Sequence, residues 1–168
     1  MVVGLEKVSI EERVRMVLKA VDIEEPSKAT IEEILLGLGR LLSVKAKKKA
    51  SVHEVTKEVR RALELAVLSP LSQRSDEELV VSVKYTHPPF KSSVLNEAYR
   101  RLLERLVRHT TEQARKLSPM WRRRLVNLIV ENIYNIAIGS DTYEYKKKIK
   151  KIFEVPQKTK EVKTSGAG

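Results

Sequence analysis

The side chains of this sequence best suited to chemistry are its arginines and lysines, because their cationic groups bind phosphate oxygens. Four arginines lie on one side of a predicted helix over residues 94–117, opposite its apolar stripe: Arg101, Arg105, Arg108 and Arg115. Such a row of guanidinium groups can follow a phosphate backbone and make bidentate contacts. Three glutamates of the same helix each precede a basic residue by four positions, which makes an ion-paired solvent face the alternative. These pairs are Glu97–Arg101, Glu104–Arg108 and Glu112–Lys116.

Three consecutive arginines, residues 122–124, stand in the first turn of the next predicted helix. Helix N-termini favour acidic side chains, because the macrodipole is positive there. A bound phosphate would relieve this conflict by accepting hydrogen bonds from the free amides and pairing with the arginines. Arg123 and Arg124 are the better candidates, since Arg122 projects nearer the apolar face. Pairing with carboxylates of the N-terminal half is the alternative, and Trp121 is interpreted as a core or interface anchor.

The helix predicted after Asp141, reaching about Glu154, carries the most uniform basic patch. Four lysines occupy the side opposite its apolar residues, with Tyr143 among them: Lys146, Lys147, Lys150 and Lys151. This face predicts an electrostatic contact with nucleic acid in which Tyr143 stacks on a base. The alternatives are a helix end stabilised by cations and an amphipathic helix on anionic lipid. Lipid is the weaker alternative, because the apolar face is short and no lipidation motif is present.

No motif predicts an enzyme. The three histidines are far apart and lack metal-ligand spacing, and no phosphate-binding glycine loop or nucleophile motif occurs. A polar strip of Asn127, Glu131 and Asn135 on the helix from residue 119 could edge an active site, but an ordinary solvated face is the preferred interpretation. We therefore expect no catalytic residue, no metal and no cofactor.

The positive charge is concentrated in the second half of the chain. The 168 residues include 33 Lys and Arg and 22 Asp and Glu, a net charge of +11. Residues 1–90 hold 15 basic and 14 acidic side chains, whereas residues 91–168 hold 18 and 8. High charge with only 4 Asn, 3 Gln and no Cys is typical of thermophilic proteins. Thermophily does not explain an excess of one sign in one half, and this asymmetry predicts a polyanion as partner.

Composition excludes several classes of protein. Cysteine is absent, so disulfides and cysteine-based zinc sites are excluded. No run approaches 18 consecutive apolar residues, so no membrane helix is predicted. The opening residues lack the basic and long apolar regions of a signal peptide, and we expect a cytoplasmic location.

Capping patterns predict where helices begin. Ser9, Thr30 and Ser51 each stand three residues before a glutamate and are followed by apolar residues at helical spacing. Ser92 or Ser93 and the dipeptide at 118–119 predict two later helix starts. Two glycines of the second helix, Gly37 and Gly39, weaken it or allow close approach of another helix.

Residues 79–86 alternate between apolar and polar side chains, which favours a strand paired with another segment or a second subunit. A short helix beginning at Ser75 is the alternative.

The sequence thus predicts a mainly α protein of six to seven helices in a bundle-like arrangement, with one short strand or strand pair. We expect a charge-balanced helical unit over 1–70, a strand or loop connector over 71–92 and a basic helical unit over 93–155. A disordered basic tail is expected over 156–168. One compact domain is the alternative. The expected function is non-catalytic binding of RNA or DNA in a nucleic-acid-processing or ribonucleoprotein complex. A protein-interaction subunit is the alternative, with a larger complex or homo-oligomer as further partners and no membrane.

Overall fold

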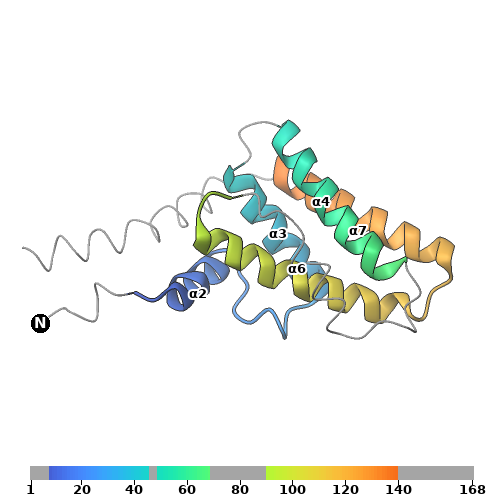
Figure 1. Cartoon of the computed structure of the whole chain (residues 1–168), viewed down its shortest axis with the longest axis horizontal. Helices are drawn as coiled ribbons and strands as arrows, with labels where there is room; N and C mark the ends of the chain where they lie inside the picture. The colour runs from blue at the N-terminus through green and yellow to red at the C-terminus, as the bar shows by residue number, and fades with distance from the viewer. Residues whose placement is uncertain (1–7, 46–48, 69–89, 140–168) are drawn as a thin grey trace, which may run out of the picture.

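The computed structural model describes residues 8–45, 49–68 and 90–139, and this part of the chain is mainly helical (Figure 1). It contains five helices, fewer than the six to seven expected, and confirms the mainly α class. Both the strand expected at 79–86 and the helix expected after Asp141 lie outside the described residues. The helices are α2 (Ile10–Ala20), α3 (Ile31–Lys45), α4 (Lys49–Val67), α6 (Ser93–Ala114) and α7 (Pro119–Gly139).

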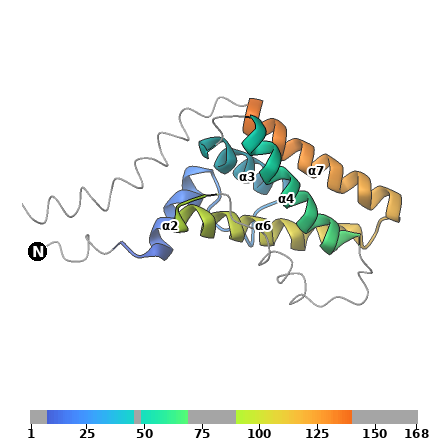
Figure 2. The ribbon, with the colours of Figure 1, turned by 45° about the horizontal axis from the view of Figure 1, so that its top comes forward.

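Helices α6 and α7 diverge from the short turn that joins them, and α3 and α4 fill the space between them (Figures 1 and 2). Helix α4 runs antiparallel to α7, whereas α3 packs against both α6 and α7 toward their open end. Helix α2 packs against α6. Direct contact between α6 and α7 is slight, so α3 and α4 hold them in place.

Hydroxyl caps begin three of the helices as the sequence predicts. The Ser9 hydroxyl accepts from the Glu12 amide at 3.1 Å, and the Thr30 hydroxyl accepts from the Glu33 amide at 3.2 Å. Ser92 caps α6 by accepting a hydrogen bond from an amide of its first turn. The start expected at Ser51 is wrong, because α4 begins at Lys49, where residues of high helix propensity extend it upstream.

The end of α6 also differs from the prediction. The helix was expected to reach Leu117 but ends at Ala114, and the amides of Lys116 and Leu117 bond carbonyls three residues back. This tighter turn removes the helical spacing between Glu112 and Lys116. Within the described residues, the expected ion pair between these two side chains is not formed.

The core is centred on α6 rather than on α7. The apolar stripe predicted for α6 is buried throughout: Leu95, Ala98, Tyr99, Leu102, Leu103 and Leu106. The wide apolar face of α7 in the sequence predicts a central core helix, and this prediction is wrong at two of its positions, because Trp121 is 50% exposed and Leu128 is 57% exposed. The buried side of α7 lies instead along Val126, Ile129, Val130, Ile133 and Ala137. The apolar surface of α7 is therefore wider than the part that its neighbours cover.

Two glycines let α3 approach its neighbours closely, which confirms the close-approach interpretation. A Cβ atom on Gly39 would lie 2.3 Å from Cγ2 of Ile136 in α7. A Cβ atom on Gly37 would lie 3.0 Å from Cγ1 of Ile23. Real Cβ atoms do not approach other carbons to 2.3 Å, so the spacing of α3 and α7 requires glycine at position 39.

None of the helices in the described ranges combines the length and the apolar character needed to cross a membrane.

We expect Gly39→Ala to lower the free energy of unfolding by about 1–2 kcal/mol, because overpacking at Ile136 outweighs the better helix propensity of alanine. Gly139→Ala is the matched control, since a Cβ atom there would meet nothing within 4 Å. The control should be neutral or slightly stabilising. Urea denaturation of both variants measures the difference, and equal effects at the two positions would contradict the close contact.

Candidate functional site

The arginines predicted on α6 are largely engaged with acidic side chains. Arg101 pairs with Glu11 of α2 at 2.5 Å and with Glu97 of its own helix at 3.4 Å. Arg108 pairs with Glu104 at 3.2 Å. Two of the three ion pairs predicted from the sequence are thus confirmed. Both arginines stabilise the fold locally, and their charges are compensated.

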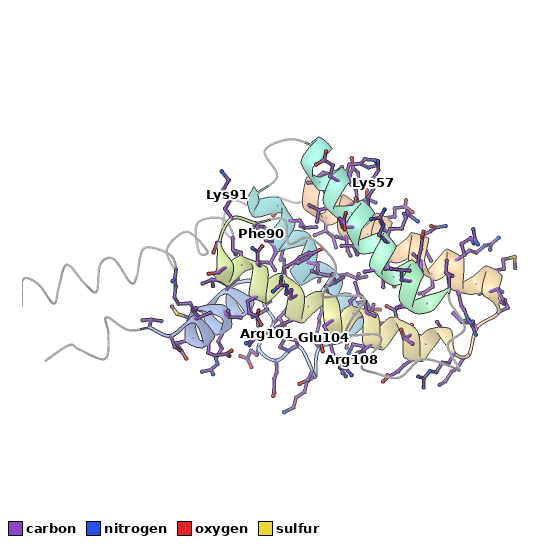
Figure 3. All side chains as sticks on the ribbon, in the orientation of Figure 1. Lys57, Phe90, Lys91, Arg101, Glu104 and Arg108 are labelled. Carbon is purple, nitrogen blue, oxygen red and sulfur yellow. The ribbon has the colours of Figure 1, made fainter. Side chains whose placement is uncertain are left out.

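Arg101, Arg105 and Arg108 line one shallow groove of about 320 Å³ together with Glu104 and residues 26–27. In the view of Figure 3, Arg101, Glu104 and Arg108 lie along the lower side of α6, whereas Lys57 lies on α4 at the opposite side of the molecule. The Arg105 Nε donates to Nε2 of His109 at 3.0 Å rather than to a carboxylate. Arg115, the fourth arginine of the predicted row, is exposed at the C-cap of α6. The described structure therefore brings three of the four arginines into one groove.

The three arginines at the start of α7 have different surroundings. The Arg122 Nε donates to the carbonyl oxygens of Ala114 at 2.8 Å and Leu117 at 2.9 Å, so its cation closes the C-terminus of α6. The guanidinium carbon of Arg124 lies 4.9 Å from the ring centre of Trp121, in a cation–π contact. Arg123 is exposed and forms no ion pair within the described residues. Arg123 and Arg124, which the sequence favours as phosphate ligands, are both exposed.

A groove of about 460 Å³ lies between α4 and α7, and we name it the α4–α7 groove. The α4 wall consists of His53, Thr56, Lys57 and Arg60, and the α7 wall consists of Asn127, Val130, Glu131 and Tyr134. Two cross-groove contacts set the register of these antiparallel helices. The His53 ring meets the Tyr134 ring edge-on with centres 6.2 Å apart, and the Arg60 guanidinium donates to the Asn127 side-chain oxygen.

A second hollow of about 460 Å³ lies on α7, and we name it the Trp121 hollow. Its lining is mostly apolar: Leu117, Trp121, Leu125 and Leu128, with Arg124, Asn127 and Glu131 at the polar side. Asn127 and Glu131 line both this hollow and the α4–α7 groove, so the two depressions are adjacent. Together they form one indented surface that includes Lys57, Arg60 and Arg124.

The basic wall of α4 was missed by the sequence analysis, which treated the N-terminal half as charge-balanced. Its signal was present, because His53, Lys57 and Arg60 follow the i, i+4, i+7 spacing of one helix face. The net charge summed over residues 1–90 is close to zero, so it does not reveal these basic side chains on one face of α4. The distribution of charge around each helix is therefore more informative than the sum over a segment.

Several predictions find no test in the described residues. Tyr143 and the lysines predicted to bind nucleic acid lie outside them: Lys146, Lys147, Lys150 and Lys151. Among the described residues no group of three acidic or histidine side chains could hold a metal ion. Two residues of the polar strip of α7, Asn127 and Glu131, lie in the two depressions beside Arg60 and Arg124. His109 is not among their neighbours there, because it accepts a hydrogen bond from Arg105 on α6.

Comparison of the chain with protein-family models, curated proteins and solved structures finds no match.

We expect substitution of Arg122 to lower the free energy of unfolding more than substitution of its neighbour Arg123. Arg122→Ala should lower the free energy of unfolding by about 1.5 kcal/mol or more, because it removes a charged donor shared by two carbonyls at a helix end. Arg123→Ala should change it by no more than about 0.5 kcal/mol, since Arg123 is exposed. Urea denaturation compares the two variants, and equal losses would contradict the capping role.

The Glu11–Arg101 pair predicts a pH-dependent contribution to stability. The hydrogen bond from Arg101 lowers the pKa of Glu11 below its ordinary value and raises the pKa of Arg101. The carboxylate therefore stabilises the fold above about pH 4.3, the ordinary glutamate pKa, and this contribution is lost as the pH falls through the lower folded-state pKa.

The Tm difference between the wild type and Glu11→Gln should accordingly be present at pH 7 and shrink toward zero near pH 3. Glu24→Gln is the control, because Glu24 is exposed and has no ion pair within the described ranges. A difference that stays constant from pH 7 to pH 3 would rule out the contribution of this pair.

Proposed function

We propose that this protein binds nucleic acid without catalysis, as an accessory subunit, through phosphate contacts along the α4–α7 groove and the start of α7. One observation carries the proposal: Lys57, Arg60 and Arg124 line adjacent depressions that hold a single carboxylate, Glu131. Cations arranged along a groove attract a phosphate backbone and release its counterions.

The degree of pairing favours this surface over the arginine row of α6. Arg101 and Arg108 already have carboxylate partners at 2.5–3.4 Å, and a phosphate would have to compete with them. Lys57 is exposed and forms no ion pair in the described part of the chain, and Arg60 bonds a neutral amide. The cations of the groove therefore lose less when they bind a phosphate.

The spacing of the cations supports an extended ligand. Lys57 and Arg60 are three residues apart on α4, which is roughly 4.5 Å along the helix. Arg60 meets Asn127, one turn from Arg124, so the cations continue onto the N-terminal part of α7. Arg115 and Lys116 in the α6–α7 turn and Arg123 in the first turn of α7 are also exposed. Only 8 aromatic side chains occur in the chain, so affinity would come from phosphate contacts with little base reading.

The predicted lysine face after Asp141 would add to this surface. Its four lysines and Tyr143 carry much of the excess charge of the second half. From the sequence we expect these side chains to contribute further phosphate contacts.

A protein-interaction subunit without nucleic-acid contact is the second candidate function. Its specific support is the apolar surface of Met120, Trp121 and Leu128, which are each at least half exposed. Contiguous exposed apolar side chains are typical of interaction sites.

We expect fluorescence anisotropy with labelled single- and double-stranded RNA and DNA to show binding that weakens as salt rises. Reversing two groove cations, Lys57→Glu with Arg60→Glu, should weaken binding at least tenfold. The slope of log K against log salt should fall by about 1.4 on a single strand, about 0.7 for each lost phosphate contact. Arg123→Glu with Arg124→Glu should act in the same direction, as should reversal of the four predicted lysines.

The matched control is Arg15→Glu with Lys28→Glu, which changes the net charge by the same amount on exposed residues outside the groove. This control should weaken binding far less than the groove variant. Equal weakening, or an absence of binding to all four nucleic acids at low salt, would overturn the proposal.

A further inference from the structure

An apolar stripe on α7 is only partly covered within the described structure, where Leu125 packs against the edge of the core. Trp121, Leu125 and Leu128 recur at i, i+4 and i+7, and Leu117 continues the line at the turn before the helix. These side chains line the Trp121 hollow, and Trp121 and Leu128 are 50% and 57% exposed. The stripe is contiguous, unlike the isolated exposed apolar side chains that are ordinary on protein surfaces.

The helical geometry of α7 separates this stripe from the core. At 100° per residue, Trp121, Leu125 and Leu128 lie within about 60° of one another. Their centre is about 105° from the centre of the buried face at Val126, Ile129 and Ile133. Helix α7 thus has a second apolar face, of which the described residues cover Leu125 in part and leave Trp121 and Leu128 at least half exposed.

The charge around the stripe is positive on its N-terminal side. Arg124 lies beside Trp121, and the exposed Arg123, Arg115 and Lys116 are nearby in sequence at the α6–α7 turn. Glu131 is the one carboxylate of the hollow and stands at its far end. Tryptophan flanked by arginine is a combination enriched at the energetic centres of protein interfaces.

A second copy of this chain fits the stripe poorly. In a two-fold contact centred on the stripe, midway between Trp121 and Leu128, the Arg124 side chains of both copies would meet. Shifting the centre to pair Arg124 with Glu131 of the copy would place Trp121 against Asn132 and Asn135. The net charge of +11 on each chain adds repulsion to either arrangement.

A nucleic acid also fits the stripe less well than the neighbouring α4–α7 groove. Leucine side chains at positions 125 and 128 offer no ring on which a base could stack. One face of the Trp121 ring is already covered by the Arg124 guanidinium at 4.9 Å. A base would have to displace that contact.

We infer that this stripe docks an amphipathic helix of a partner protein, with leucine-like side chains on one face flanked by glutamates or aspartates. The partner's apolar face covers Trp121, Leu125 and Leu128, and its carboxylates pair with Arg124 and Arg123. Within α7 the stripe rises over seven residues from Trp121 to Leu128, roughly 10 Å or two helical turns, and Leu117 extends it at the preceding turn. Lys57 and Arg60 are not needed for it, so this inference does not depend on the proposed nucleic-acid binding, although Arg123 and Arg124 would serve both ligands.

The test uses the full-length protein and two synthetic helical peptides of about 14 residues. Both carry leucines at i, i+3, i+4 and i+7, one flanked by glutamates and the other by lysines. Trp121 is the only tryptophan of the chain, so its emission reports directly on the stripe. We expect the glutamate peptide to shift the emission to shorter wavelength and to bind at least tenfold more tightly than the lysine peptide.

Three variants sharpen the test. Leu128→Lys should weaken the glutamate peptide at least tenfold, and Arg124→Glu should reverse the preference between the two peptides. Ile10→Lys is the matched control, because Ile10 is also 57% exposed but lies on α2. Binding by the control should equal that of the wild type.

Four results would overturn the inference. The first is equal binding of both peptides, and the second is equal weakening of binding by Leu128→Lys and Ile10→Lys. The third is a dimer, detected by sedimentation equilibrium, that Leu128→Lys dissociates. The fourth is a blue-shifted tryptophan emission of the free protein that disappears when the acidic residues Asp76, Glu77 and Glu78 are changed to lysine. The third assigns the stripe to a second copy, and the fourth assigns it to the chain's own acidic segment. Loss of peptide binding with retained nucleic-acid binding would leave the proposed function intact.

Discussion

The close contact of α3 with α7 at Gly39 is the constraint on which the arrangement of the helices depends. Helices α6 and α7 scarcely touch each other, so their relative position is transmitted through α3 and α4. A Cβ atom on Gly39 would overlap Ile136, and any larger residue would push the two helices apart. The spacing of α7 from the rest of the core then determines how α4 can lie against it. The α4–α7 groove is a consequence of that packing.

The arginines of the second half have three different surroundings, although their side chains are chemically identical. Arg101 joins α2 to α6 through Glu11, and Arg122 closes the C-terminus of α6. Arg123 and Arg124, at the next two positions, stay at the surface. A guanidinium near carboxylates or helix carbonyls is stabilised where it lies, whereas one beside a tryptophan in solvent keeps its charge available. The excess of positive charge is therefore smaller on the α6 side than the composition indicates.

The proposed binding surface and the apolar stripe are adjacent on α7, and both include Arg123 and Arg124. Asn127 and Glu131 lie between them and line both depressions. A subunit that held a nucleic acid along the groove and a partner protein on the adjacent stripe would position the two close together. The helix is suited to this role because α3 and α4 cover only part of its circumference.

Local sequence determined much of the secondary structure. Ser9, Thr30 and Ser92 supply side-chain acceptors for amides that a helix start leaves free, and this interaction needs only residues three positions apart. The buried stripe of α6 and the Glu97–Arg101 and Glu104–Arg108 pairs follow from helical spacing in the same way. What the tertiary structure alone decided was which apolar face of α7 is buried, which arginines meet distant carboxylates or carbonyls, and that His53, Lys57 and Arg60 face α7. Each of these depends on contacts between residues far apart in the chain, whose geometry is set by helix packing rather than by local spacing.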